Sequence, residues 1–432
     1  MPTADLPVAP PALSGVATDF LESSGTDLLR RWDLHQSFWD MRLAAGLDFG
    51  GRVVSGRIGA EIRALTRAHE EVAGVNFASQ DHLSLIGHPL VRDAAADALA
   101  RFGPHAGSPA TLQGGSRPAL LLEERLADLL GCREATLFPT GWAAGYGAIR
   151  VLVRPEDHVL LDSLAHPALQ EAAAAATRRL HRIPHGAHEA LLQRLGRIRA
   201  EDARAGILVV AESISPVDAA VPDLRAIRDG ARAHGATLLV SLGHDFGAQG
   251  HGGLGFLGQA GLVGEIDVVV GSLAHVFATD GGFVASGAQG LKQALRHFAS
   301  PLSASCAISP LQAAVALAAL GILRSKEGAE RRRRLAANVR RLREGLAARA
   351  FEVLGTPSAV VPVLLGPLAR ARLMTRGLLG DGMLVNLVEH PAVARGASRW
   401  LLQTMADHTP EQIDRLVAAA ADARERLGEA PG

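Results

Sequence analysis

Three histidines stand shortly after apolar, strand-like runs, where a side chain is well placed to do chemistry. The runs and their histidines are, in chain order, 158–162 with His166, 237–242 with His244, and 266–273 with His275. An imidazole has an ordinary pKa of about 6.5, so it can accept or donate a proton at neutral pH. A histidine in an apolar chain is also commonly a structural hydrogen-bonding group, so the position alone leaves both roles open.

Amines and thiols are scarce in this chain. It holds 44 Lys and Arg residues, but only two are lysines, Lys292 and Lys326, both on helical stretches that we expect to be exposed. The two cysteines, Cys132 and Cys306, are too few for a disulfide framework, which favours a reducing, cytoplasmic location. Cys306 would be a nucleophile if a histidine activated it; the alternative is buried packing.

Composition excludes several classes of protein. The formal net charge is zero and no basic stripe is present, so we expect no nucleic-acid partner. The longest nearly apolar run, 313–323, is well short of the roughly 20 residues that span a bilayer, so we expect no membrane segment. The N-terminal residues lack the basic start and apolar run of a secretion signal.

The candidate histidines lie in a region where short apolar runs alternate with helical patterns. We expect strands at 135–138, 158–162, 207–211, 237–242 and 266–273, and helices at 119–130, 168–179, 190–200 and 224–234. This alternation predicts an α/β fold with a mostly parallel central sheet covered on both faces. Ligands of such sheets bind at the carboxyl ends of the strands, where the histidines stand.

The remaining segments complete a predicted division into three parts. Residues 1–74 form an N-terminal extension, or arm, with an amphipathic helix at 27–43, and residues 75–308 form the large domain. Residues 309–432 form a smaller C-terminal α/β domain that begins with a long Arg-rich helical stretch, 309–350. Later strands are expected at 360–365, 383–388 and 399–405, and a final helix from Pro410.

Eight segments, read in order, resemble the motifs of one known family. They are 76–85, 115–131, 140–145, 162–166, 212–218, 244–255, 272–283 and 399–409. The family is the α-oxoamine synthases, which use pyridoxal phosphate to condense an amino acid with an acyl-CoA thioester. The resemblance is collinear from about residue 75 to residue 425. It implies a fold-type-I transferase fold, like that of aspartate aminotransferase, with a large domain and a smaller C-terminal α/β domain.

The chain departs from the family at the positions that do the cofactor chemistry. His275 stands where the family has the lysine that forms the Schiff base, and an imidazole cannot form that bond. Ser241 replaces the aspartate that pairs with the pyridine nitrogen. Arg399 remains, but Leu401 replaces the second arginine, which binds the amino-acid carboxylate. The resemblance therefore implies the fold without the usual pyridoxal chemistry, and we expect no Schiff-base cofactor.

The resemblance also implies which residues surround the reaction site. His166, His244 and His275 would line one cavity and act as general bases, and Asp280 would orient His275 in the manner of a catalytic triad. Four residual phosphate-site positions would bind an anion or a substrate oxyanion: Gly141, Trp142, Ser272 and Ser305. Substrate contacts would come from Ser215, Ser241, Cys306 and Arg399. The histidine spacing matches no recognised zinc motif, so no metal is expected.

These observations predict an acyltransferase that works without pyridoxal phosphate. It would accept an acyl group from CoA or from the phosphopantetheine of an acyl carrier protein and pass it to a small-molecule acceptor in specialised-metabolite biosynthesis. We expect a homodimer, because family members share this pocket across a dimer interface. The alternative is a non-catalytic subunit that supports a pyridoxal-dependent partner, since heterodimers of that kind exist in the family.

Overall fold

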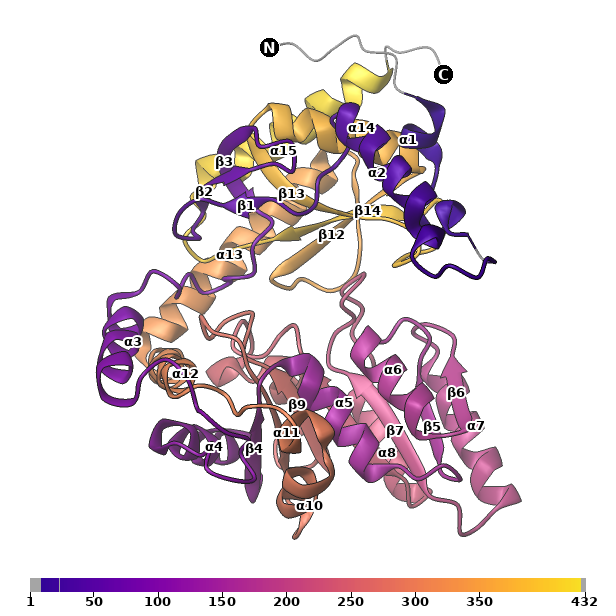
Figure 1. Ribbon diagram of the computed structural model, residues 1–432, viewed down its shortest axis with the longest axis vertical. Helices are drawn as coiled ribbons and strands as arrows, with labels where there is room; N and C mark the ends of the chain where they lie inside the picture. Colours follow the sequence, from indigo (N-terminus) through magenta and orange to yellow (C-terminus); the bar gives the residue numbers. More distant parts are fainter. Residues whose placement is uncertain (1–8, 23, 429–432) are drawn as a thin grey trace. The chain divides into compact units, whose positions relative to one another are not determined.

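The structure, a computed structural model, describes residues 9–22 and 24–428. They form two compact units: the first comprises the described residues up to Ser79 and those from Ala336 onward, and the second is Gln80–Leu335 (Figure 1). The division falls within helix α13 (Lys326–Ala348). Among the described residues, none of the helices combines the length and apolar character needed to cross a bilayer.

The second unit is built on a seven-stranded sheet in the order β4-β10-β9-β8-β7-β5-β6. β10 is antiparallel to β4 and to β9, and all other neighbouring strands are parallel. The strands are β4 (Glu134–Phe138), β5 (His158–Asp162), β6 (Arg179–Ile183), β7 (Ile207–Glu212), β8 (Thr237–Leu242), β9 (Val268–Ser272) and β10 (Gly282–Ser286).

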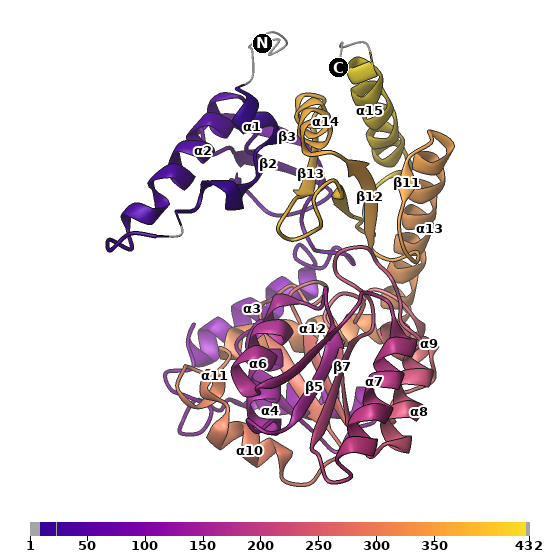
Figure 2. The ribbon, with the colours of Figure 1, turned by 90° about the vertical axis from the view of Figure 1, so that its right-hand side faces the viewer.

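Helices cover both faces of this sheet (Figure 2). One face carries α5 (Gly141–Leu152) and α6 (Pro167–Ala176), and the other carries α7 (His188–Glu201) and α8 (Leu224–Ala233). The unit also contains α3 (Pro89–Phe102), α4 (Arg117–Leu130), η3 (His251–Gly253), α9 (Gly255–Gln259), α10 (Leu291–Phe298), α11 (Ser300–Ser303) and α12 (Pro310–Leu323). This two-sided arrangement explains why the central strands read as continuous apolar runs.

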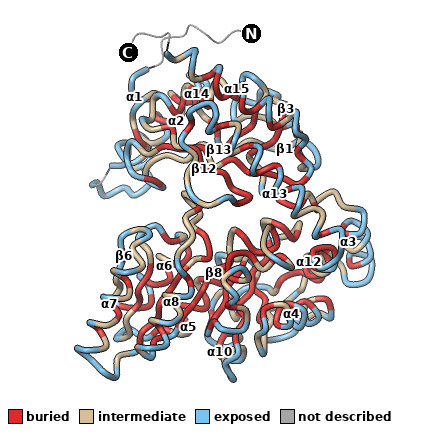
Figure 3. Tube along the Cα trace, turned by 180° about the vertical axis from the view of Figure 1, so that it is seen from behind, coloured by how far each residue is buried: buried red, intermediate tan, exposed pale blue. Residues whose placement is uncertain are grey.

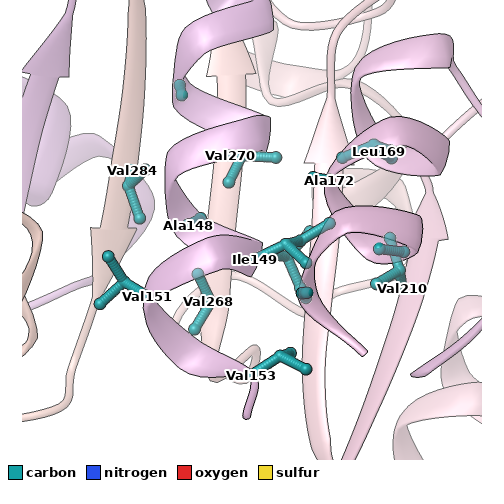
Figure 4. Packing of buried hydrophobic residues seen from close by; sticks show 14 of the residues in the cluster. Ala148, Ile149, Val151, Val153, Leu169, Ala172, Val210, Val268, Val270 and Val284 are labelled. Atoms are coloured by element: carbon teal, nitrogen blue, oxygen red, sulfur yellow. The ribbon is translucent and has the colours of Figure 1, made fainter. Parts of the chain in front are cut away.

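Small and β-branched side chains build the core between α5 and the sheet (Figure 4). Ala148 and Ile149 of α5 are fully buried and belong to the same cluster as Val268 and Val270 of β9. Small residues on the helix allow it to lie close to the valine-rich strands. This packing fixes the first turn of α5 at the carboxyl end of the sheet, beside the predicted site.

The first unit has its own seven-stranded sheet in the order β1-β2-β3-β13-β14-β12-β11. Its strands are β1 (Val53–Val54), β2 (Glu61–Leu65), β3 (Glu71–Phe77), β11 (Glu352–Val353), β12 (Val360–Gly366), β13 (Met383–Val388) and β14 (Ser398–Gln403). Its helices are α1 (Pro10–Ser14), η1 (Ala17–Phe20), η2 (Arg30–Trp32), α2 (Asp33–Ala44), α14 (Leu368–Gly380) and α15 (Pro410–Gly428). Figure 3 shows that the central strands of both sheets are largely buried.

The structure assigns the predicted arm and the long predicted helical stretch differently from the sequence. The arm predicted at 1–74 supplies β1, β2 and the start of β3, which pair with one another and, through β3, with β13. The helical stretch predicted at 309–350 is interrupted at Arg324 and Ser325, and α12 then packs on α3 and α4 within the second unit.

A buried ion network joins the arm to the rest of the first unit. Glu389 accepts two hydrogen bonds of 2.8 Å from Arg372 and one of 2.9 Å from Arg42. Arg372 is completely buried and also donates to the carbonyls of Ala12, Leu13 and Gly15 near the end of α1. The two arginines hold the pKa of Glu389 below its usual value against the opposing effect of burial.

Replacing Glu389 with alanine should strongly destabilise the first unit. Two buried guanidinium groups would lose their counter-charge, which costs about 3–5 kcal/mol of unfolding free energy. Urea unfolding followed by tryptophan fluorescence measures this loss, because Trp32, Trp39 and Trp400 lie in the first unit. The control is Asp414→Ala, which breaks an exposed pair with Arg341 and should cost about 1 kcal/mol or less. Equal losses in the two variants would contradict the network's role.

Candidate active site

A cavity of about 220 Å³ lies at the carboxyl ends of β7, β8 and β9, beside the first turn of α5. His166, His244 and His275 all line this cavity, as the resemblance implied. Its lining is Gly141, Trp142, Gly145, His166, Ala168, Leu169, Glu212, Ser241, Gly243, His244, Val270, Gly271, Ser272 and His275. We refer to this space as the imidazole cavity.

The imidazoles are in mutual contact. The rings of His244 and His275 stack with centroids 4.8 Å apart, and those of His166 and His244 are 6.2 Å apart. A fourth ring, that of His82, lies edge-on to His275 at 6.4 Å, and its backbone N–H donates to the His275 carbonyl. His82 was not predicted as a site residue. It lies in one of the segments that carried the family resemblance, and that was the only signal for it.

Burial keeps these imidazoles uncharged at neutral pH. Desolvation is the main cause that lowers the pKa of His166 and of His275. It lowers the pKa of His244 well below the usual value, and the neighbouring imidazoles add repulsion to any positive charge there. The cavity therefore presents neutral rings, the form that can accept a proton.

The hydrogen bonds of each ring decide which nitrogen can react. A ring N–H of His275 donates to the Gly243 carbonyl, and its Nδ1 is buried with no hydrogen-bond partner among the described residues. Nδ1 of His166 accepts from the Ala168 N–H and so caps α6. His244 has neither constraint, because its ring nitrogens form no hydrogen bond among the described residues and are not sealed off. His244 is therefore the ring best placed to take a proton.

The predicted orientation of His275 by Asp280 is not found. Asp280 is exposed, and among the described residues no hydrogen bond or ion pair joins it to His275. The Gly243 carbonyl instead fixes the tautomer of His275, because it holds the single ring proton of the neutral imidazole.

The first turn of α5 offers two free backbone donors to the cavity. The Thr140 hydroxyl accepts from the Ala143 N–H and caps the helix, whereas the N–H groups of Gly141 and Trp142 have no partner among the described residues. A Cβ on Gly141 would lie 2.7 Å from the Ser272 Cβ, so only glycine allows this close approach. Such a turn can hold an anion or stabilise a developing oxyanion.

Glu212 is the one carboxyl group among the described residues that line the cavity. Its Oε2 accepts a hydrogen bond from the backbone N–H of His166 at 3.1 Å. Desolvation raises the pKa of Glu212 to about 8, so this side chain is mostly protonated and neutral at pH 7. Glu212 also lines a second cavity of about 480 Å³ over β5, β6 and β7.

An ion cluster borders the second cavity and was not predicted. His185 lies between Asp162, at 2.9 Å, and Asp218, at 2.8 Å, and these carboxylates raise its pKa to about 10. His185 follows the edge strand β6, whose polar sequence did not suggest a strand. Ser215, predicted as a substrate contact, lines this second cavity rather than the imidazole cavity.

The other predicted residues are dispersed. Ser241 and Ser272 line the imidazole cavity, whereas Ser305 is exposed and donates to the Pro301 carbonyl. Cys306 is also exposed, so the alternative of buried packing is wrong. Arg399 lies on β14 in the first unit. In the part of the chain that the structure describes, no three His, Cys, Asp or Glu side chains are arranged to hold a metal ion.

Neither lysine has access to the imidazole cavity. The sequence suggested that Lys292 is exposed, but the side chain is largely covered and its Nζ pairs with Glu123 at 2.8 Å. It lies beside Glu134 and Ser286, at the ends of β4 and β10 that are farther from the cavity. Lys326 is exposed at the start of α13.

Comparison with known proteins defines the family. The family model of aminotransferase class I and II matches residues 73–419, and the chain belongs to this family. Within it, the 8-amino-7-oxononanoate synthase of Pseudomonas fluorescens is 34% identical over 356 residues, or 82% of this chain and 89% of the relative. The match places the chain among the α-oxoamine synthases, as the sequence motifs predicted.

Solved structures agree with the predicted fold-type-I architecture. Serine palmitoyltransferase of Sphingomonas wittichii superposes with a TM-score of 0.87 at 26% identity, covering 94% of this chain and all of that one. A lysine-to-alanine variant of the S. paucimobilis enzyme, with a bound PLP–myriocin aldimine, also superposes with a TM-score of 0.87. It is 28% identical and covers 94% of this chain and all of that one.

The imidazole cavity does not fit pyridoxal phosphate as a covalently held cofactor. Among the described lining residues there is no primary amine, so nothing can bind its aldehyde as a Schiff base. The pyridine nitrogen of the cofactor would also lack an ionised partner. Glu212, the one carboxyl group among the described lining residues, is held protonated, and Ser241 offers a neutral hydroxyl. Among the described lining residues, the backbone N–H groups of Gly141 and Trp142 are the part that could hold the phosphate of such a cofactor.

Replacing Glu212 with glutamine should change how stability depends on pH. Because the folded-state pKa, about 8, exceeds the usual 4.5, the folded chain retains a proton that the unfolded chain releases. Stability should therefore fall as pH rises from about 4.5 to about 8 and then level off. Glutamine mimics the protonated acid, so Glu212→Gln should remove that part of the slope.

Urea unfolding at a series of pH values measures the difference between the two slopes. The matched control is Glu156→Gln, which changes an exposed carboxylate (71% exposed) in the same unit and should follow the wild-type curve. A Glu212→Gln curve that also overlays the wild type would show that Glu212 is ionised in the folded protein.

Proposed function

We propose that this chain is an acyltransferase that moves an acyl group from a thioester to a small-molecule acceptor without pyridoxal phosphate. The observation that carries the proposal is the neutral His244 ring beside the backbone N–H groups of Gly141 and Trp142, since none of these nitrogens has a hydrogen-bond partner among the described residues. Relatives in the family include serine palmitoyltransferase, whose name denotes transfer of an acyl group. The thioester would come from CoA or from an acyl carrier protein, in the biosynthesis of a specialised metabolite.

The proposed reaction is a direct acyl transfer. The acceptor's N–H or O–H group attacks the thioester carbonyl carbon while His244 takes the proton. The amides of Gly141 and Trp142 hold the oxyanion that develops on the carbonyl oxygen. The C–S bond then breaks, the thiolate takes the proton from His244, and the acylated acceptor and the free thiol leave. No electron acceptor or further co-reactant is needed.

The roles of the other histidines are supporting ones. Of the three histidines expected to act as general bases, His275 and His166 are less suited than His244, because His275 has a sealed Nδ1 and His166 caps α6. The stacked His275 ring positions His244 and excludes water from one face. His166 presents its other ring nitrogen to the cavity, where it can donate to the substrate.

His244→Ala should abolish most of the transfer. Loss of a general base lowers kcat by about 10²- to 10⁴-fold, whereas His275→Phe, which keeps an aromatic ring in the stack, should retain most of kcat. The assay supplies acyl thioesters and candidate acceptors to the purified chain and follows the release of free thiol. Because the pKa of His244 is lowered, wild-type kcat should persist at pH values well below 6.5. Unchanged kcat in His244→Ala would overturn its role.

The assay also separates the enzyme from a non-catalytic subunit. A chain that gains activity only when a pyridoxal-dependent partner co-purifies with it would be a supporting subunit. We propose a homodimer instead, and the second unit displays exposed apolar side chains at Leu112, Leu120 and Phe298 that an interface could cover. Mass measurement of the active species decides between the two assemblies.

Independence of pyridoxal phosphate is tested by covalent trapping. Wild-type protein mixed with pyridoxal phosphate and then reduced with borohydride should carry no label on the peptide that contains His275. The His275→Lys variant is the positive control and should gain a label there, since it restores an amine at the cavity. Acyl transfer by the wild type that required added pyridoxal phosphate would contradict the proposal.

A further inference from the structure

The second cavity lies where the connections of the sheet diverge. β5 and β7 are neighbours, but the chain leaves β5 through α6 toward β6, and it leaves β7 through α8 toward β8. These connections run in opposite directions, which opens a crevice at the carboxyl ends of the two strands. In open α/β sheets such a switch point is a preferred place for ligands. The cavity of about 480 Å³ lies there.

The walls of this cavity are mainly apolar. They include Leu164, Ile183, Leu191, Val210, Val221 and Ile227. Leu191 faces the cavity from the first turn of α7, and Ala220 lies on the opposite loop before α8. An apolar cavity of this kind binds a ligand mainly by removing apolar surface from water.

The carboxylates at the cavity already have hydrogen-bond partners in the protein. Asp162 accepts from His185 and from the Leu164 and Gly186 N–H groups. Asp218 accepts from His185, and Asp223 caps α8 through the Ala226 N–H. A ligand would have to break these bonds to use the carboxylates. Glu212, which accepts from the His166 backbone N–H, lines both this cavity and the imidazole cavity.

The charge of the lining sets a second condition. The lining carries the carboxylates of Asp162 and Asp223 and the imidazolium of His185, and Asp218, which is not part of the lining, pairs with His185. A carboxylate or phosphate placed in the cavity would face a net negative charge and would be repelled. The space therefore favours an uncharged, apolar group.

We propose that the second cavity binds the neutral alkyl chain of the acyl thioester, with the thioester end directed past Glu212 into the imidazole cavity. This inference rests on the proposed acyl transfer and adds the substrate class: straight, unfunctionalised aliphatic acyl groups, as opposed to chains that end in a carboxylate. The length of chain that the protein prefers is then set by Leu191 and Ala220.

Variants that change the cavity in opposite directions test the inference. The probes are butanoyl, octanoyl and dodecanoyl thioesters of pantetheine for turnover, and the matching alkyl thioethers, which cannot transfer, for binding by calorimetry. Ala220→Phe fills the cavity and should weaken dodecyl binding about tenfold or more while leaving butyl binding nearly unchanged. Leu191→Ala enlarges it and should shift the preference toward longer chains.

Leu195→Ala is the matched control for Leu191→Ala. Leu195 is fully buried one turn later on α7 and does not line the cavity, so its loss should change stability but not chain preference. Circular dichroism confirms that each variant is folded. A dodecyl chain that ends in a carboxylate should bind about tenfold more weakly than the plain chain.

The outcomes separate this inference from the proposed function. Chain-length-dependent binding that Ala220→Phe removes, without any turnover, would support the cavity assignment and refute the acyl transfer. Turnover that ignores chain length in all variants would overturn the assignment and leave the transfer standing. Tighter binding of a chain that ends in an ammonium group would also overturn it, in favour of a site for an amine acceptor.

Discussion

Desolvation at the carboxyl ends of β7, β8 and β9 is the constraint on which the site depends. The same surroundings lower the pKa of His244 and raise that of Glu212 to about 8, so both groups are neutral at pH 7. A charged cofactor ring needs ionised partners, whereas a neutral imidazole can take a proton from an incoming nucleophile. The cavity is therefore suited to proton transfer within a neutral environment.

The fold retains the framework of a pyridoxal enzyme around this changed interior. Gly141 lies against Ser272, and a Cβ on Gly282 would meet the Thr140 carbonyl at 2.4 Å, so the turn before α5 fits closely between β9 and β10. That packing keeps two backbone donors pointing at the site whatever ligand is bound. Such a turn can bind an oxyanion as well as a phosphate.

The sequence predicted the large elements because their signals are local. The runs at β5 and β8 were predicted with the observed bounds, since buried parallel strands are continuous apolar segments. The strands β1, β2 and β6 were missed because they are short or carry charged residues, and because their burial depends on pairing with other strands; β1 and β6 are also edge strands. The break at Arg324 and Ser325 was missed because the helical pattern continues on both sides.

The site could be predicted only in part, for a related reason. Resemblance to the family brought His166, His244 and His275 to one cavity, because strand order fixes which strand ends meet. The resemblance could not predict the hydrogen bonds of these side chains. The pairing of His275 with Gly243, the ion pairs of His185 and the shared position of Glu212 all depend on side-chain directions that a one-dimensional pattern does not contain.

The protonation state of the three cavity histidines is the most direct test of this account. Nitrogen NMR of histidine-labelled protein reports the charge and tautomer of each ring, and single substitutions at His166, His244 and His275 assign the signals. At pH 7 we expect three neutral rings, with the His275 proton on Nε2, where it donates to the Gly243 carbonyl. A positively charged His244, or a His275 that carries its proton on Nδ1, would contradict it.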